Sequence, residues 1–290
     1  MQQSARALQQ EDGHNIWQST RALQQIDGRN IWQSTRACSP RPECSGMPFD
    51  ASLSVIVTGF ENSGTTVLSQ LIMSSPHIFG AFECGLLLAC SPREFTRVQP
   101  FHNWLPQRWR LPGRDAAAQI DKAACHQHAY SILLNQSLCL QRVGAKSLLD
   151  KTPAYVYVLD EVMRSTPGVP VVVAQKSQAS QLHSWAKRGV RGDEALKRYG
   201  AGVAAHKRAA TAFPERLRTV DTHLLEACPA MRSGNVSDLS AEGCAAANAT
   251  LASVYRWLSR FDPHAAWGAW DARYLTLATH KAKAVACKRP

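Results

Sequence analysis

Two patterns of hydrophobic and polar positions alternate along the chain from residue 53 onward. The apolar run LSVIVTG is typical of a buried parallel strand over 53–58, and it ends in Gly59. The stretch 65–75 follows and places Val67, Leu68, Leu71 and Ile72 at helical spacing. Similar apolar runs predict strands over 79–83, 146–149, 169–174 and 216–220. Helical spacing predicts further helices over 115–140, 154–166, 177–187, 192–212 and 246–260.

This alternation predicts the fold class. Strands that take turns with helices along a chain form a parallel sheet with helices packed on both of its faces. We therefore expect an α/β fold, a three-layer sandwich with a central parallel sheet, formed by a domain that spans residues 51–290.

The first 35 residues contain a tandem repeat. The segment 6–20 reads RALQQEDGHNIWQST and the segment 21–35 reads RALQQIDGRNIWQST, which gives a period of 15 residues. Two copies are too few to stack into a core. The following CSPRPECSGMP is linker-like. We therefore interpret residues 1–50 as a flexible extension and linker, and expect residues 1–45 to make no tertiary contacts.

Composition and net charge limit the kinds of ligand that the chain can be expected to bind. The chain has 290 residues and 45% hydrophobic content, which is enough for a real core. Its net charge is +11, and nearly all of the excess lies after residue 46. This charge suits nucleotide phosphates, acidic polysaccharides or nucleic acid, and it equally suits a basic solvated surface. The basic residues are not interleaved with aromatic ones, which argues against nucleic acid. Neither a transmembrane segment nor a signal peptide is readable.

The cysteines and histidines do not predict a metal site. Nine cysteines fit no zinc spacing, and His126 and His128 would point to different sides of a helix. Cys228 and Cys244 bracket a polar loop and are candidates for a disulfide. Three glycosylation sequons favour a glycoprotein of the Golgi lumen, with a cytoplasmic protein as the alternative. Their asparagines are Asn135, Asn235 and Asn248.

The segment GFENSGTT over 59–66 is the strongest candidate for chemistry. It stands between a predicted strand and a predicted helix, where backbone N–H groups and a helix N-terminus bind phosphate. It is similar to a Walker A loop, but Thr65 replaces the lysine that serves the β- and γ-phosphates of a nucleoside triphosphate. The alternative is a threonine-capped helix after a glycine turn.

The loop resembles the 5′-phosphosulfate loop of the PAPS-dependent sulfotransferase superfamily, where PAPS is 3′-phosphoadenosine 5′-phosphosulfate. Its S-G-T-T is most similar to the tyrosylprotein-sulfotransferase-like branch. Three landmarks follow in the order of that family: Glu83, the D-K-T-P element over 150–153, and Lys176 with Ser184 eight residues later. The resemblance implies a P-loop-like fold, PAPS as co-substrate and no metal.

The resemblance also implies a role for each residue. Gly59, Asn62, Ser63, Gly64, Thr65 and Thr66 would bind the 5′-phosphosulfate. Lys176 and Ser184 would bind the 3′-phosphate. Lys151 would neutralise charge on the sulfuryl group, and Glu83, in apolar sequence that favours a raised pKa, would be the general base. Each residue has an alternative interpretation: surface lysines for Lys151 and Lys176, a helical serine for Ser184 and a helix-capping glutamate for Glu83.

Two departures from the family pattern keep a second function open. Asn62 stands where the family has a lysine or arginine, and Lys176-Ser177 replaces an Arg-Asp pair. We therefore expect a sulfotransferase that acts on a hydroxyl or amine, with Asn62 as a weaker partner of Lys151. The alternatives are a non-catalytic nucleotide-binding protein and, less favoured, a P-loop kinase. The acceptor, a carbohydrate or a protein tyrosine among the candidates, would use residues 90–145 and the C-terminal third.

Overall fold

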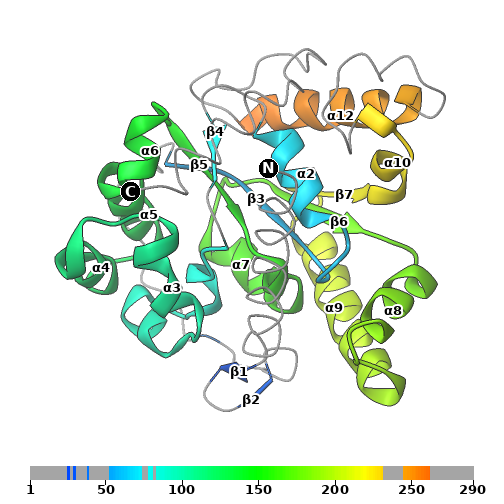
Figure 1. Ribbon diagram of the computed structural model, residues 1–290, viewed down its shortest axis with the longest axis horizontal. Coiled ribbons are helices and arrows are strands. Elements are labelled where there is room, and N and C mark those ends of the chain that lie inside the picture. The colour runs from blue at the N-terminus through cyan, green and yellow to red at the C-terminus, as the bar shows by residue number, and fades with distance from the viewer. Residues whose placement is uncertain are drawn as a thin grey trace, which may run out of the picture.

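The computed structural model describes residues 25–26, 29–30, 38, 52–73, 78–80, 83–230 and 244–261. A five-stranded sheet lies at its centre, with the strand order β4-β5-β3-β6-β7 and every neighbouring pair parallel (Figure 1). The strands are β3 (Leu53–Gly59), β4 (Ile78–Phe79), β5 (Ser147–Lys151), β6 (Val171–Gln175) and β7 (Leu217–Asp221). The predicted α/β class with a central parallel sheet is confirmed.

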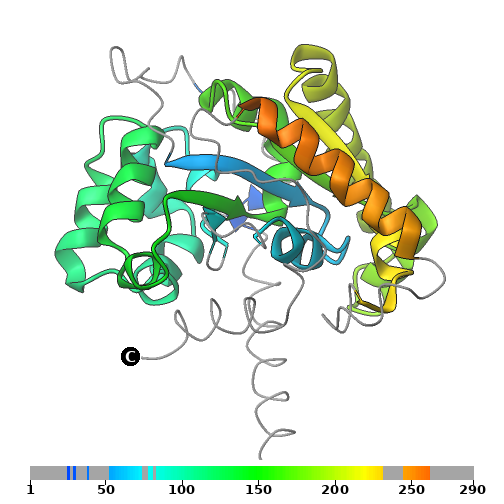
Figure 2. The same ribbon diagram turned by 90° about the horizontal axis from the view of Figure 1, so that it is seen from above.

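Helices cover both faces of the sheet (Figure 2). On one face, α2 (Thr65–Ile72), α10 (Thr222–Glu226) and α12 (Cys244–Leu258) pack on Val55, Val57 and Val172. On the other face, α5 (His126–Gln136), α7 (Leu159–Ser165) and α9 (Gly192–Ala212) pack on Ile56 and Val173. Successive strand residues therefore supply two separate cores, which is why these strands are continuous apolar runs.

The remaining elements are short helices and one small hairpin. The α-helices are α3 (Phe101–Arg108), α4 (Gly113–Asp121), α6 (Leu138–Arg142) and α8 (Gln178–Ala186). The 3₁₀ helices are η2 (Leu86–Leu88), η3 (Pro92–Arg97), η4 (Pro153–Val158) and η6 (Ser259–Phe261). An antiparallel pair, β1 (Gln25–Ile26) and β2 (Arg29–Asn30), lies within the second copy of the sequence repeat.

The single helix predicted over 115–140 is wrong, because three helices occupy this stretch. Cys125 is the N-cap of α5, and its sulfur accepts a hydrogen bond from the backbone N–H of His128. Ser137 is the N-cap of α6, and its hydroxyl accepts from Leu140 and donates to the carbonyl of Trp109. Each cap satisfies the first N–H groups of a new helix and so ends the run of the preceding one. The helix predicted over 154–166 likewise divides, into η4 and α7.

Disulfides connect distant parts of the chain. The predicted Cys228–Cys244 bridge is confirmed. A second bridge joins Cys38 to Cys90, so the expectation that residues 1–45 make no tertiary contacts is wrong at Cys38. A crosslink between two cysteine thiols is a contact that residue periodicity does not reveal. The rest of 1–50 except β1 and β2, the basic segment 280–290 and the Asn235 sequon lie outside the described residues.

Candidate functional site

The predicted site residues follow strands of the sheet. Lys151 ends β5 and Lys176 directly follows β6, while the 59–66 loop begins at the end of β3. Parallel pairing places Lys151 opposite Val57, two residues before the loop, and places Ala174 opposite Gly59. Because β3 separates the β4–β5 half of the sheet from the β6–β7 half, its carboxyl end is the kind of edge where open α/β sheets bind ligands.

Two glycines shape the loop between β3 and α2. Gly59 has φ of +149°, and a Cβ there would lie 2.3 Å from the carbonyl oxygen of Ala174. Gly64 has φ of +91°, and a Cβ there would lie 2.9 Å from the Cβ of Thr222. Gly64 is also the N-cap of α2, where no side chain supplies a cap hydrogen bond. The threonine-capped alternative is therefore wrong, and the first-turn N–H groups have the arrangement that binds anions.

Two buried hydrogen-bond donors of the loop have no partner among the described residues. They are the hydroxyl of Ser63, a residue with 0% exposure, and the side-chain amide nitrogen of Asn62. An unsatisfied buried donor costs about 1–3 kcal/mol, so native proteins place such donors where a ligand, ion or water takes the bond. Asn62 has φ of 69°, a left-handed conformation that asparagine tolerates better than most residues. The loop therefore offers two side-chain donors next to an uncapped helix N-terminus.

Glu61 fixes the loop to two helices and was missed by the sequence analysis. Its buried carboxylate accepts hydrogen bonds from Arg198 of α9 and, at 3.0 Å, from the hydroxyl of Tyr157. Its backbone carbonyl accepts from the side chains of Gln181 (2.7 Å) and Trp185 (3.2 Å), both on α8. The loop conformation is thus held from outside, whether or not a ligand is bound.

A sequence signal for this anchor existed on α9. The buried positions of that helix are Ala195, Arg198, Gly202, Ala205 and Ala209, at alternating spacings of three and four residues. An arginine on such an apolar face predicts a buried acidic partner. Burial alone would lower the pKa of Arg198, but the Glu61 carboxylate outweighs it and the net shift is upward. Burial and the same carboxylate raise the pKa of Tyr157.

The structure brings Glu83 and Lys151 together. The ammonium of Lys151 lies 2.9 Å from Oε1 of Glu83, and the two side chains are 11% and 12% exposed. Lys151 is the last residue of β5, and Glu83 lies four residues after the adjacent strand β4, so the shared edge of the sheet explains how residues 68 positions apart meet. A carboxylate and an ammonium are placed beside the end of β3, where the loop starts.

A buried network under this pair holds the D-K-T-P element. The Asp150 carboxylate is 0% exposed and accepts hydrogen bonds from Tyr130 (2.5 Å), Tyr155 (2.7 Å) and Thr152 (2.8 Å). The Thr152 hydroxyl in turn accepts from the backbone N–H of Gly85, two residues after Glu83. Burial raises the pKa of Asp150, although these hydrogen bonds oppose the shift. The network thereby fixes the end of β5 to the segment that carries Glu83.

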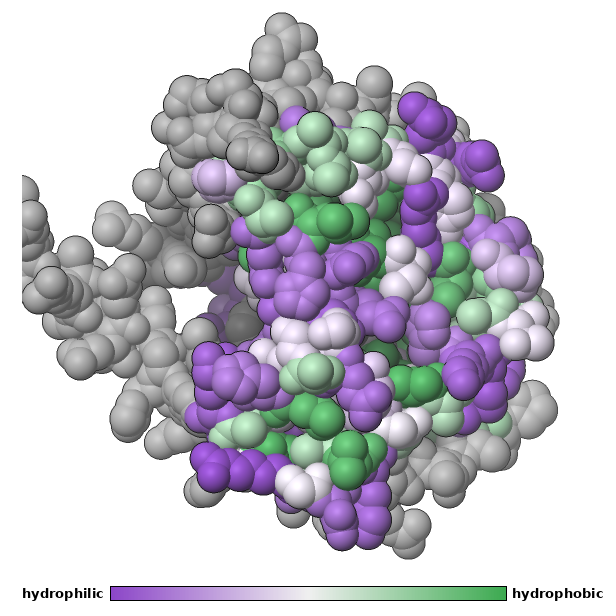
Figure 3. Space-filling view, turned by 90° about the vertical axis from the view of Figure 1, so that its right-hand side faces the viewer, coloured by the Kyte–Doolittle hydropathy of each residue, from purple (hydrophilic) through white to green (hydrophobic). Residues whose placement is uncertain are grey.

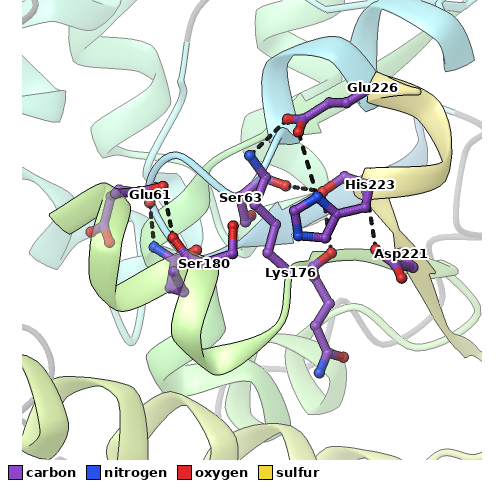
Figure 4. Close-up of polar contacts among 11 residues, drawn as sticks. Glu61, Ser63, Lys176, Ser180, Asp221, His223 and Glu226 are labelled. Carbon is purple, nitrogen blue, oxygen red and sulfur yellow. Dashed lines mark hydrogen bonds and ion pairs between the residues drawn. The ribbon is translucent and has the colours of Figure 1, made fainter. Parts of the chain in front are cut away.

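Lys176 and Ser184 lie on segments that contact the loop, but their side chains bond elsewhere. The ammonium of Lys176 lies 2.7 Å from Oε1 of Glu226, on α10 (Figure 4). The Ser184 hydroxyl donates to the carbonyl of Ser180, one turn earlier on α8. No sequence pattern predicted Glu226, because its proximity to Lys176 arises only from the packing of α10.

Thr222, also missed, connects the loop to the Lys176 segment. Its hydroxyl lies 2.5 Å from the carbonyl oxygen of Ser63 and 3.1 Å from that of Gln175. Gln175 immediately precedes Lys176. The first residue of α10 therefore holds the loop and the end of β6 side by side.

Other features of the described residues lie apart from this edge. A pocket of about 480 Å³ is lined by α3 and α4 residues, and on its wall His102 and Asp121 bond to each other at 3.1 Å. Within the described ranges, no group of three or more His, Cys, Asp or Glu side chains is arranged to hold a metal ion. No helix in the same ranges is long and apolar enough to cross a membrane.

Comparison with known proteins gives a family match. A sequence model described as the sulfotransferase family matches residues 54–232, which is more than half of the chain. A search of curated proteins finds no match.

A search of solved structures also found matches to the fold. The sulfotransferase domain of the Synechococcus olefin synthase is 15% identical, with a TM-score of 0.49 over 84% of this chain and 79% of that one. The sulfotransferase domain from the curacin biosynthetic pathway is 13% identical, with a TM-score of 0.48 over 65% and 74%. A sulfotransferase from Mycobacterium tuberculosis is 17% identical, with a TM-score of 0.35 over 80% and 76%.

Proposed function

We infer the function from one premise: this chain belongs to the sulfotransferase family. We propose that it moves a sulfuryl group from PAPS to a hydroxyl or amine of an acceptor, by in-line displacement and without a metal. One observation carries the proposal. The 59–66 loop holds two buried donors that have no partner among the described residues. They lie at a helix N-terminus without a side-chain cap, beside the Glu83–Lys151 pair.

The loop supplies the donor-phosphate site in this proposal. The backbone N–H groups of Gly64, Thr65 and Thr66 bind the 5′-phosphosulfate, together with the hydroxyls of Ser63, Thr65 and Thr66. The backbone N–H of Ser63 donates within the loop, to the carbonyl of Phe60 at 3.0 Å. The Ser63 hydroxyl and the Asn62 side-chain N–H, which have no partner within the described part of the chain, donate hydrogen bonds to oxygens of the ligand. The face that carries α8 and α9 has hydrophilic areas with hydrophobic ones between them (Figure 3). Its exposed residues include the cations Lys187, Arg191 and Lys197 and the acids Asp193 and Glu194.

Glu83 and Lys151 supply the chemistry. The acceptor oxygen forms a bond to sulfur while the bond from sulfur to the bridging phosphate oxygen breaks. Glu83 takes the proton of the acceptor hydroxyl, and Lys151 neutralises the charge that grows on the sulfuryl and bridging oxygens. The Asp150 network holds both groups in one position. The substrates then bind next to groups that are already oriented, which lowers the entropic part of the barrier.

A second candidate function rests on Asn62. A neutral amide there gives a hydrogen bond roughly half as strong as that of a charged donor. A protein that binds the nucleotide without turnover is the alternative that this residue favours. A P-loop kinase is less favoured, because Thr65 stands in place of the lysine that serves the γ-phosphate.

Calorimetric titration tests the donor site. We expect the desulfated nucleotide PAP to bind clearly more tightly than ATP in the absence of magnesium. Ser63→Ala removes one ligand donor and is expected to weaken PAP binding by about 10- to 150-fold, because one hydrogen bond to a charged group is worth about 1.5–3 kcal/mol. Tighter binding of ATP than of PAP would reject the sulfotransferase site in favour of the kinase alternative.

The acceptor and the compartment follow as further proposals. We propose a carbohydrate or tyrosine acceptor that reaches Glu83 along the 90–145 segment, which packs against it through Phe101 on Gly85. We also propose a luminal, oxidising site of action, because six of the described cysteines are disulfide-bonded.

A further inference from the structure

The Lys176–Glu226 ion pair occupies the cation that the proposed function assigns to the 3′-phosphate of PAPS. The Lys176 ammonium is 2.7 Å from Oε1 of Glu226, and the lysine side chain is only 11% exposed, against 36% for the glutamate. Lys176 is therefore paired with a carboxylate that is more exposed to solvent than the lysine itself. Figure 4 shows this pair. The Glu226 carboxylate offers Lys176 negatively charged oxygens, as a phosphate would.

Glu226 is held over the site by the backbone of α10. Thr222 begins this helix and bonds to carbonyls of the loop and of β6, while the Asp221 side chain caps it through the N–H of His223. Cys228, two residues after Glu226, is bridged to Cys244 at the start of α12. The carboxylate is therefore fixed near Lys176 by contacts on both sides of it in the sequence.

We propose that Glu226 is an anionic competitor at the donor site, which keeps Lys176 paired until a 3′-phosphate displaces it and so limits the affinity for 3′-phosphorylated nucleotides. This inference rests on the proposed function and deepens it, because it states what sets the affinity of the site for its nucleotide. A nucleotide that lacks the 3′-phosphate leaves the ion pair intact and gains nothing from Lys176. A phosphate carries up to two negative charges and three acceptor oxygens, whereas a carboxylate carries one negative charge. The 3′-phosphate can therefore displace the Glu226 carboxylate from the Lys176 ammonium.

The charge on Glu226 has a measurable consequence. It repels an incoming 3′-phosphate and must give up its ion pair with Lys176, although its other oxygen lies 3.8 Å from Nδ1 of His223. Both effects lower the affinity for PAP. Neither effect reaches a nucleotide whose ribose carries a 3′-hydroxyl. Removal of the charge therefore raises the affinity for PAP selectively. Glu226 is more than a third exposed, so solvent and salt weaken the effect to about tenfold.

The test is calorimetric titration of two probes that differ only in the 3′-phosphate, PAP and adenosine 5′-monophosphate. We expect Glu226→Gln to tighten PAP by about tenfold and to change the monophosphate by less than twofold. Glu215→Gln is the matched control: it makes the same change on the 65%-exposed glutamate that precedes β7, at the opposite end of the strand that leads to α10. It is expected to leave both affinities unchanged. Glu226→Ala repeats the test if the glutamine variant does not fold.

The outcomes separate this inference from the function on which it rests. Equal changes for the two probes, or none for PAP, would remove Glu226 from the 3′-phosphate site while tight binding of PAP to the wild type left the proposed function standing. Failure of the wild type and of Glu226→Gln to bind either probe would overturn both.

Discussion

At the residue scale, Glu83 and Lys151 are the base and the cation of the proposed mechanism. The ion pair is 2.9 Å long and nearly buried. Substitution of Glu83 by Gln keeps the shape and removes the proton acceptor. A general base contributes about 10²- to 10⁴-fold, so we predict that Glu83→Gln lowers turnover by that factor and leaves PAP affinity nearly unchanged.

The matched variant is Lys151→Ala, which removes the cation of the same pair. We predict a loss of turnover at least as large, because Asn62 offers no second charge in the loop. Turnover would be measured as labelled sulfate transferred per enzyme, with PAP affinity from titration beside it. Unimpaired transfer by Glu83→Gln would refute its assignment as the base.

Residue types and spacing predicted some of these side chains and missed others. The pair Glu83–Lys151 was predictable, because Glu83 ends the expected strand 79–83 and Lys151 follows the expected strand 146–149, so both reach one edge of a parallel sheet. Glu226 and Thr222 were not, because their positions depend on how α10 packs on the loop. Arg198 was predictable in principle from its place among small residues on the buried face of α9. The buried position of Arg198 indicates that its partner is a buried acid, but it does not identify that acid as Glu61.

At the element scale, the 59–66 loop depends on helices α8 and α9 for its shape. Arg198→Met removes the hydrogen-bonded cation of the buried Glu61 carboxylate, which keeps the Tyr157 hydroxyl and the electrostatic attraction of Arg188. Removal of one partner of a buried ion pair costs about 3–5 kcal/mol, and because Arg188 compensates in part we predict a loss of about 3 kcal/mol in the free energy of unfolding. Denaturant unfolding would measure it, together with weaker PAP binding as the loop loses its anchor.

Arg208→Met is the matched control on the same helix. Arg208 is 56% exposed and pairs with Asp160, so its removal is expected to cost about 1 kcal/mol or less. If Arg198→Met and Arg208→Met lowered the free energy of unfolding by similar amounts, the Arg198–Glu61 pair would contribute no more to stability than an exposed ion pair.

The elements themselves were mostly predictable, and the exceptions have local causes. Parallel strands buried on both faces form continuous apolar runs, so β3, β5, β6 and β7 were found close to their bounds. The helix over 115–140 failed because Cys125 and Ser137 are caps, and their side-chain bonds interrupt an otherwise helical pattern. Short-range periodicity carries no information about such competing hydrogen bonds.

At the scale of the whole molecule, a disulfide joins the start of α12 to the segment that follows α10. The Cys228–Cys244 bridge closes a loop of 16 residues between α10 and α12. Constraint of a loop of this length stabilises a fold by about 3 kcal/mol. We predict that the double variant Cys228→Ser/Cys244→Ser loses about this much stability in denaturant unfolding, and that dithiothreitol lowers the stability of the wild type. Unchanged stability in both experiments would contradict a structural role for the bridge.

The central claim concerns the whole molecule: its sheet edge gathers a donor loop, a base and a cation into a site for sulfuryl transfer. The most direct measurement is transfer of ³⁵S from labelled PAPS to panels of carbohydrate and tyrosine-peptide acceptors. We predict transfer to one of these classes by the wild type. We further predict about tenfold faster transfer by Asn62→Arg, since a charged donor is worth roughly 1–1.5 kcal/mol more than a neutral one. Tight PAP binding with no transfer to any acceptor by either protein would contradict the claim and establish a nucleotide-binding protein without turnover.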